Sequence, residues 1–352
     1  MPKPDDLVAK VAIILVNWNG WQDSVACIES CLALEPSGAR IILCDNGSSD
    51  GSVEAVVAWA QGQRPVARDP ASPVKIPSPR LPNAVVVLDR TAAERGDDGA
   101  GAELLVVRTG GNLGFAGGNN VGLRWAMARG FDYMWLLNND TVVPPDALAH
   151  LVAKCRDDAR VGLCGSTMVE YYRPTVLQGY AAAIDRRSFR GRHLGAGRAA
   201  ADVVAAEAAD PPRGGEMIYP IGASILVTAA FLAQVGLMEE AYFLYYEEAD
   251  WVLRGEADFT LAFARNSIVY HKIGAAAGST PQGLSARSVG YLYRSRLRIA
   301  RRFAPAAMPR VVWGMIDEGL RGLARGRTAR ARAALRALTG RVAIPVEARQ
   351  KP

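Results

Sequence analysis

The chain has 352 residues, of which 50% are hydrophobic and 22% are charged. This balance excludes a disordered chain and predicts a globular protein with a sizeable core, in one large domain or two smaller ones. The formal net charge is +6, but residues 287–352 alone hold 16 basic and 3 acidic side chains, a balance of +13. The basic character is therefore a property of the C-terminal region.

Two features bear on cellular location. The five cysteines are odd in number, lie mostly in apolar runs and lack a second pair with zinc-ligand spacing, which favours buried, reduced thiols in a cytoplasmic protein. The longest uncharged stretch, residues 217–238, is interrupted by Pro220 and several polar residues, so we expect a strand followed by a helix there instead of a transmembrane helix. No secretory signal is expected at the N-terminus.

In chain order, short apolar runs alternate with helical spacing of apolar residues. Residues 11–16 and 40–44 are predicted as buried strands, and residues 24–34 and 53–60 as the helices that follow them. This order predicts an α/β fold with a mostly parallel sheet and right-handed crossovers.

The pattern is interrupted twice. Residues 61–101 are rich in proline and are predicted to form an exposed insertion with one strand at 84–88, and residues 186–215 are rich in Ala, Gly and Arg and are predicted to be a mobile excursion. The other expected elements are strands at 103–108, 131–137, 161–165, 218–228, 261–263 and 267–271, and helices ending near 129 and spanning 147–156 and 229–235. We expect residues 1–285 to form one domain and residues 286–352 a basic helical region.

Three loops rich in Asn, Asp and Gly follow predicted strands, at 17–20, 45–52 and 110–120. In a parallel sheet these loops gather at one edge, where backbone N–H groups suit a nucleotide and Asp45 can accept from a base imide or a ribose hydroxyl. Ordinary turn chemistry is the alternative for each loop taken alone. Neither G-x-G-x-x-G nor G-x-x-x-x-G-K-[ST] occurs in them, which disfavours an NAD(P)-dependent oxidoreductase.

The segment FDYMWLLNNDT, residues 131–141, is a buried strand that stops at Asn138-Asn139-Asp140. A carboxylate at the carboxyl end of such a strand, next to neutral amides, suits a hard cation such as Mg²⁺ or Mn²⁺. The alternative is a strand-to-helix turn with Asn and Asp as turn formers.

Six segments together resemble family 2 glycosyltransferases, most closely their bacterial rhamnosyltransferase-like branch. They are VAIILVNWNG, IILCDNGSSDGS, GGNLGFAGGNN, WLLNNDT, IGASILVTAAFLAQVGLMEEAYFLYYEEADWVLR and IVYHK, in the family's order between residues 11 and 272. The resemblance implies a GT-A-like (Rossmann-like) fold, a nucleoside-diphosphate sugar donor, a divalent metal and inversion at the anomeric carbon.

The resemblance also assigns roles to residues. The implied donor-binding residues are Asn17, Asp45, Asn46, Asn112, Gly117, Asn120 and Asn138. Asp140 stands in the family's metal motif, in which Asn138 replaces the first Asp, and His271 after the SIVY strand would complete a site for Mg²⁺ or Mn²⁺. A structural role is the alternative for this histidine. His150 and His193 have no comparable sequence context.

An acidic segment preceded by aromatics, Glu247-Glu248-Ala249-Asp250, matches the family's catalytic segment. Glu248 stands where the family has an Asp base, with Glu247 as the alternative, and Tyr246 and Trp251 are the implied acceptor contacts. A general base must reach the acceptor hydroxyl, and flanking aromatics can raise its pKa by desolvation. An acidic helix start favoured by the helix dipole is the alternative interpretation.

The basic C-terminal region interleaves arginines with apolar residues over 291–303 and again over 313–338. A basic amphipathic helix predicts contact with a membrane surface, while nucleic-acid binding and packing on the catalytic domain are alternatives. Because acceptors in the family are often lipid-linked sugars at the cytoplasmic face, the resemblance favours peripheral membrane contact, and no nucleic-acid partner is expected.

The sequence therefore predicts a metal-dependent inverting glycosyltransferase in the cytoplasm, peripheral on the inner face of the cell membrane. It would move a sugar, with L-rhamnose the leading candidate by resemblance, from a nucleoside-diphosphate donor to a glycan or polyprenyl-linked glycan. A non-catalytic nucleotide-sugar binder is the main alternative, because the metal motif and the base position both depart from the family pattern.

Overall fold

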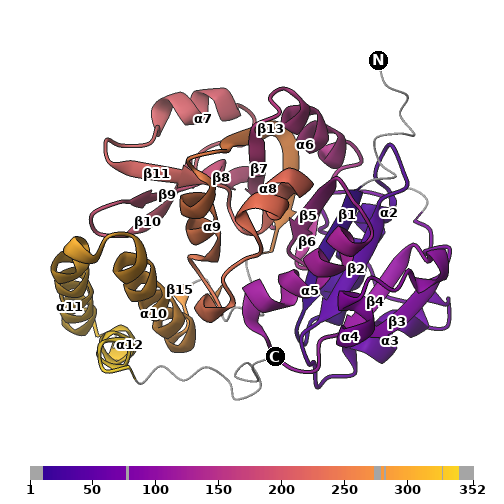
Figure 1. Ribbon diagram of the computed structural model, residues 1–352, viewed down its shortest axis with the longest axis horizontal. Coiled ribbons are helices and arrows are strands. Elements are labelled where there is room, and N and C mark those ends of the chain that lie inside the picture. Colours follow the sequence, from indigo (N-terminus) through magenta and orange to yellow (C-terminus); the bar gives the residue numbers. More distant parts are fainter. Residues whose placement is uncertain (1–10, 77–78, 273–278, 281–282, 327, 341–352) are drawn as a thin grey trace.

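The computed structural model describes residues 11–76, 79–272, 279–280, 283–326 and 328–340 (Figure 1). Within them, a ten-stranded sheet runs in the order β3-β4-β2-β1-β5-β12-β7-β13-β6, with β8 paired to β7. Its strands are β1 (Val11–Asn17), β2 (Arg40–Asp45), β3 (Val85–Asp89), β4 (Leu104–Arg108), β5 (Tyr133–Leu137), β6 (Thr141–Val142), β7 (Val161–Glu170), β8 (Arg173–Gly179), β12 (Ser224–Thr228) and β13 (Thr260–His271). Strands β3, β4, β2, β1 and β5 are parallel neighbours, which confirms the predicted α/β core.

Helices cover both faces of this sheet (Figure 1). They are α2 (Trp21–Leu32), α3 (Ser52–Ala60), α4 (Arg90–Glu94), α5 (Gly114–Ala128), α6 (Ala147–Arg156), α8 (Ala229–Val235) and α9 (Glu247–Gly255). Successive side chains of β1 point to opposite faces of the sheet and so enter different cores. Ile13 belongs to the core that includes residues of α2, α3 and α6, whereas Ile14 belongs to the core that includes residues of α4, α5, α8 and α9. Helix α5 comes so close to β1 that a Cβ on Gly122 would lie 2.6 Å from the Ile14 side chain.

The segment at 61–101 is only partly an insertion. The predicted strand at 84–88 is present as β3, but β3 pairs in parallel with β4 and so extends the main sheet. Helix α4 follows it and packs with its Ala93 in the core. The short turn η1 (Gly99–Gly101) then leads into β4. The excursion from the sheet therefore ends where β3 begins.

Residues 186–215 are not the mobile excursion that their composition predicts. They include β10 (Gly191–Leu194) and α7 (Val203–Ala209), and β10 joins β9 (Ala181–Asp185) and β11 (Glu216–Tyr219) in a second sheet with the order β10-β9-β11. Arg192 holds this layer together by ion pairs with Asp210 at 2.6 Å and Glu216 at 2.9 Å. Pairing between distant residues orders a segment whose own sequence has little periodicity.

Two further boundaries differ from the prediction. The expected strand at 218–228 is divided into β11 and β12, with Pro220 between them, because proline cannot donate to a ladder. The two short extended pieces at 261–263 and 267–271 form the single strand β13, which shifts its register against β7 between Ala264 and Ile268.

The basic C-terminal region forms three helices against the rest of the molecule: α10 (Ala286–Phe303), α11 (Met308–Ala324) and α12 (Thr328–Leu338) (Figure 1). The remaining short elements are η2 (Glu240–Tyr242), η3 (Pro305–Ala307), β14 (Ser279–Thr280) and β15 (Gly283–Leu284). The hydroxyl of Ser295 on α10 donates to the carbonyls of Tyr242 and Leu244 at 3.2 and 2.9 Å, so α10 is anchored to the segment before α9. Across the described residues, we find no helix with the length and apolar character that crossing a bilayer requires.

Candidate active site

The carboxyl ends of β1 and β2 meet at one edge of the sheet, as the parallel pairing requires. Asn17 ends β1, and its Nδ2 donates to Asp45 Oδ2 at 2.8 Å at the end of β2. The backbone N–H and hydroxyl of Ser48 donate to the same carboxylate at 3.0 and 2.7 Å. The Asp45 carboxylate is thus held in one orientation by three donors. Asn17 itself is fully buried and positions Asp45, and its direct contact with a donor stays a prediction.

The amides predicted to bind donor are mostly engaged in joining loops. Asn46 donates to the Gly114 carbonyl at 2.8 Å and accepts from Thr109. Asn120 donates to the Met238 carbonyl at 2.9 Å and to Glu240, and accepts from the Met238 N–H at 3.1 Å. Both side chains are buried and use their amides in these contacts. In these contacts the two side chains fix α5 against the neighbouring segments, and their role in donor contact stays a prediction.

Two other predicted donor residues lie at the start of α5. Asn112 Oδ1 accepts from the Gly114 N–H at 3.0 Å, which shapes the entry to the helix. A Cβ on Gly117 would lie 2.6 Å from Leu113 Cβ, so this glycine serves the packing of the first turn. Neither residue lines the cavity described below.

Asp140 and His271 are brought together from strands far apart in the chain. His271, at the end of β13, pairs with Thr141 of β6, which places its Nε2 3.1 Å from Asp140 Oδ1. The other ring nitrogen, Nδ1, lies 2.8 Å from the amide oxygen of Gln178. An amide oxygen can only accept, so Nδ1 carries a proton. Asn138 Nδ2 lies 3.5 Å from His271 Nε2.

This arrangement suits a divalent metal in part. In the tautomer that has its single proton on Nδ1, Nε2 would present a lone pair on the side of the Asp140 carboxylate, where a divalent cation could bind both groups. Gln178 then fixes the tautomer from behind. Among the residues that the structure describes, no group of three or more His, Cys, Asp or Glu side chains could hold a metal ion. Two protein ligands fit only a cation that takes its other ligands from substrate or water.

The acidic pair stands at the beginning of α9, after a strained stretch of backbone. Tyr245 and Tyr246 have φ of 69° and 72°, and Phe243 has φ of 65°, a region that costs non-glycine residues about 1–3 kcal/mol each. Strain of this kind persists where the surrounding structure imposes it, and it is concentrated at functional sites. Here it turns Glu247 and Glu248 into a cavity.

Both carboxyl groups of the pair have raised pKa values. Burial raises the pKa of Glu248 from its ordinary value to about 7. Burial and then the charge of Glu248 raise the pKa of Glu247 well above its ordinary range. Glu247 Oε2 is buried and has no hydrogen-bond partner within the described part of the chain. Burial thus favours the protonated form of both carboxyl groups, and the pKa of about 7 lets Glu248 change charge near neutral pH.

Gly222 makes room for Glu248. A Cβ built on Gly222 would overlap the Glu248 carboxylate, although its backbone conformation is open to any residue. The residue thus has a steric function at the loop between β11 and β12. Its two neighbours, Ile221 and Ala223, line the same cavity.

The cavity has a volume of about 520 Å³ and joins the acidic pair to the sheet edge. Of the predicted site residues it is lined by Asn138, Tyr246, Glu247, Glu248 and His271. Sequence reasoning missed other lining residues, which include Gln178 on β8, His193 on β10, Tyr219 on β11 and Arg296 on α10. No local motif marks these four, which come from the edge strand β8, the small second sheet and the C-terminal helices.

The sequence of residues 91–196 matches the family model described as "Glycosyl transferase family 2". The chain is a glycosyltransferase, and residues 91–196, less than half of it, are the part that is similar in sequence to family 2. The matched span contains α5, β5 and Asp140 and ends before Glu248. No curated protein matches the sequence of the chain.

The fold of this glycosyltransferase is GT-A-like. Its structure is similar to that of the mannosyltransferase PcManGT from Pyrobaculum calidifontis in complex with GDP-Man and Mn2+, with a TM-score of 0.50 and 12% identity over 95% of this chain and 87% of that chain. At this identity the likeness concerns the fold alone. TarS 1-349 from S. aureus in complex with UDP aligns with a TM-score of 0.43 and 11% identity over 82% of the glycosyltransferase and 64% of TarS.

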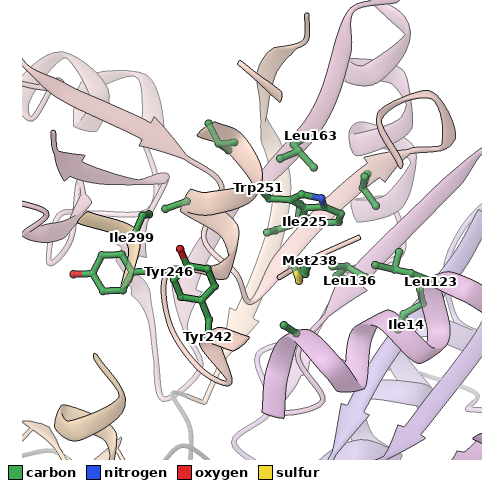
Figure 2. Packing of buried hydrophobic residues seen from close by; sticks show 14 of the residues in the cluster. Ile14, Leu123, Leu136, Leu163, Ile225, Met238, Tyr242, Tyr246, Trp251 and Ile299 are labelled. Carbon is green, nitrogen blue, oxygen red and sulfur yellow. The ribbon is translucent and has the colours of Figure 1, made fainter. Parts of the chain in front are cut away.

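Trp251 of the glycosyltransferase is not an acceptor contact. Its side chain is 0% exposed, packs edge-on against Phe231 and donates through Nε1 to the Gly236 carbonyl at 2.8 Å. Figure 2 shows it in the core with Leu163 and Ile225. The predicted contact is wrong because Trp251 is used to fill this core. Tyr246 does line the cavity, but its hydroxyl donates to the Phe189 carbonyl at 2.7 Å.

We therefore expect Trp251→Ala to act on stability. Removing a fully buried tryptophan leaves a cavity and costs about 3–5 kcal/mol of unfolding free energy, which chemical denaturation would measure. Trp251→Phe keeps most of the volume and should cost less. An alanine variant of unchanged stability with a raised acceptor KM would restore the acceptor role.

Asp250 completes the acidic segment and is structural. Its fully buried carboxylate accepts from Tyr242 Oη at 2.9 Å, from Arg254 Nε at 2.7 Å and from Arg302 Nη1 at 3.0 Å. Arg302 belongs to α10 and Arg254 to α9, so one carboxylate joins the C-terminal helices to the helix that carries the acidic pair. Asp250 thereby holds α9, the helix that begins with Glu247 and Glu248, against α10.

Proposed function

We propose that this enzyme transfers a sugar from a nucleoside-diphosphate donor to an acceptor hydroxyl with inversion, and that Glu248 is the general base. The observation that carries the proposal is the carboxyl of Glu248, which lies in the same cavity as Asn138 and His271 and has its pKa raised to about 7. A base with a pKa near the working pH combines the correct protonation state with proton affinity.

In the proposed reaction, a carboxylate oxygen of Glu248 takes the proton of the acceptor hydroxyl. The hydroxyl oxygen forms a bond to the anomeric carbon while the bond from that carbon to the diphosphate oxygen breaks, and the nucleoside diphosphate leaves with the bonding electrons. A single displacement from one face inverts the anomeric carbon. Glu247, whose raised pKa favours the protonated form, would donate a hydrogen bond inside the cavity in that form.

Asp140 and His271 are the residues that would hold Mg²⁺ or Mn²⁺, with donor phosphate oxygens completing the coordination. Bound there, the ion would supply neutralisation of the negative charge on the leaving diphosphate. The Asp140–His271 distance and the Gln178 contact that fixes the His271 tautomer support this assignment. The presence of Mn2+ and GDP-Man in the mannosyltransferase of the same fold is consistent with it.

The donor and acceptor are proposed at the level of chemical class. Asp45, held by Asn17 and Ser48 at the sheet edge, is the proposed contact to the base or ribose of the nucleotide. L-rhamnose is the proposed sugar because of the resemblance in sequence. The proposed acceptor is a glycan or a polyprenyl-linked glycan presented at the inner face of the cell membrane.

The test is thermal stabilisation by a panel of nucleoside diphosphates and their sugars, each with Mn²⁺ or with EDTA. A ligand that binds the folded state raises Tm by mass action, by an amount that grows with its concentration over Kd. We expect a shift with one nucleotide, and only with metal present, followed by release of that nucleoside diphosphate when an acceptor glycan is added. A metal-dependent shift without turnover on any acceptor would favour a non-catalytic sugar-nucleotide binder.

The pH dependence follows from Glu248. The active form carries the carboxylate, so kcat/KM should rise about tenfold per pH unit below about pH 7 and level off above it. Initial rates across this range would measure the profile, and circular dichroism at each pH would exclude unfolding as its cause. A rate that falls as pH rises through 7 would contradict a carboxylate base.

A further inference from the structure

One face of the C-terminal helices is apolar and exposed. Trp313, Ile316, Leu320 and Leu323 recur along α11 at intervals of three or four residues and so form one stripe, which we call the outer stripe. Trp313 is 69% exposed and Leu320 is 58% exposed. Leu335 adds another exposed apolar side chain on the neighbouring helix α12.

The outer stripe is not needed to hold α11 in place. The opposite face of α11 is buried by Val311, Met315, Gly319 and Gly322, and α12 packs against it near Gly319. The helix therefore has one satisfied apolar face and a second one open to water. A contiguous apolar surface of this kind marks an interaction site more often than a chance exposure.

Basic side chains surround the outer stripe. Arg310 and Arg321 are exposed on α11, and Arg325 follows at its end. The acidic side chains of α11 are already neutralised, since Asp317 pairs with Arg321 at 3.0 Å and Glu318 pairs with Arg296 at 3.0 Å. The region from residue 287 onward has a balance of +13, so it presents a positive field.

A cavity of about 610 Å³ lies where the three helices meet, and we call it the arginine groove. Its basic lining comes from α10 and consists of Arg294, Arg298, Arg301 and Arg302, of which Arg302 is already paired with Asp250 and with Glu239, a further lining residue. Met308 and Val312 line it from α11, so it adjoins the helix that bears the outer stripe. The Nε of Arg298 is buried and has no hydrogen-bond partner within the part of the chain that the structure describes. Arginines beside apolar side chains suit a phosphate attached to an apolar chain.

We propose that the outer stripe and the arginine groove dock on the surface of a bilayer that contains anionic phospholipid. The apolar side chains would enter the boundary between headgroups and acyl chains, and the arginines would contact lipid phosphates. A second copy of the chain fits this surface less well. A two-fold contact through the stripe would place the basic side chains of both copies against each other.

Docking would orient the cavity that holds Glu248. Helix α10 lines that cavity through Leu292 and Arg296, and it also lines the arginine groove. The same rigid helix thus connects the docking surface to the proposed active site. An acceptor in the same membrane would then approach the cavity from the side of the docked C-terminal helices.

Vesicle binding of the full chain tests the proposal without donor or acceptor, so its result is independent of the proposed chemistry. We expect sedimentation with vesicles of phosphatidylcholine and phosphatidylglycerol, weakened by salt, and little binding to phosphatidylcholine alone. Trp313→Ser with Leu320→Ser should lower binding roughly tenfold or more, and Arg310→Glu with Arg325→Glu should do the same for the anionic vesicles. The matched control is Tyr172→Ser, which removes a side chain that is 65% exposed at the turn between β7 and β8 and should leave binding unchanged.

Unchanged circular dichroism and Tm would show that each variant is folded. Equal binding by the wild type and the Trp313/Leu320 variant, or absence of binding to anionic vesicles, would overturn the proposal. A wild-type dimer that the same pair of substitutions converts into a monomer, with no vesicle binding, would instead assign the stripe to a second copy of the chain.

Discussion

Glu248→Gln should lower the rate of sugar transfer at pH 8 by about 10²–10⁴-fold, the usual contribution of a general base. The amide keeps the size of the side chain and its place beside Gly222 but cannot take a proton. We expect the donor to bind the variant as it binds the wild type, because the change acts on the acceptor proton. Steady-state transfer and donor-dependent Tm shifts, measured together, separate these two effects.

Glu247→Gln is the matched control, since it changes the adjacent carboxyl in the same way. Burial and the charge of Glu248 raise the pKa of Glu247 and so favour its protonated form, which the amide resembles, and Glu247→Gln should therefore preserve most of the activity. A folded-state pKa above the unfolded one favours folding at low pH, and this contribution is lost as pH rises. The variant should therefore match the wild type in Tm near pH 5 and exceed it at alkaline pH. If Glu247→Gln abolishes transfer and Glu248→Gln does not, the base is Glu247.

Asp140→Asn should reduce turnover by at least about a thousandfold at saturating donor, because it removes the carboxylate proposed to bind the metal while keeping its shape. The Mn²⁺-dependent Tm shift with the donor nucleotide should disappear as well. Asp140→Ala should have the same effect. The control is Asp146→Asn, an exposed acid at the start of α6 whose nearest partner is His150. Full activity of Asp140→Asn with metal present would remove Asp140 from the metal site.

The parts of the fold that could be predicted are those in which local sequence and tertiary environment agree. Residues 11–16 and 41–44 are apolar at every position because their strands are buried on both faces, so their patterns identify them. The second sheet could not be predicted in this way. Its order depends on Arg192 reaching Asp210 and Glu216, and no window of sequence contains these pairs.

The candidate site shows the same division. The acids and the histidine could be identified because few structural tasks need Glu247, Glu248 and His271 in such positions. Amides are ambiguous, since Asn serves equally in a ligand site and in a junction between loops. Asn17 and Asn120 turned out to serve such junctions. Trp251 follows the acidic segment closely in sequence, but helix α9 directs it into the core.

Because residue 222 is a glycine, the residues that positions 222 and 248 can hold depend on each other. The family places the shorter Asp where this chain has Glu248, and the extra methylene is accommodated because residue 222 has no Cβ. Gly222→Ala would displace the Glu248 carboxylate by steric overlap, whereas the same alanine beside Glu248→Asp would fill space that the shorter acid vacates. The two substitutions should therefore be non-additive. A lineage with a Cβ at residue 222 could acquire the longer acid only after losing that Cβ, so relatives with Glu at the position of residue 248 should retain glycine at 222.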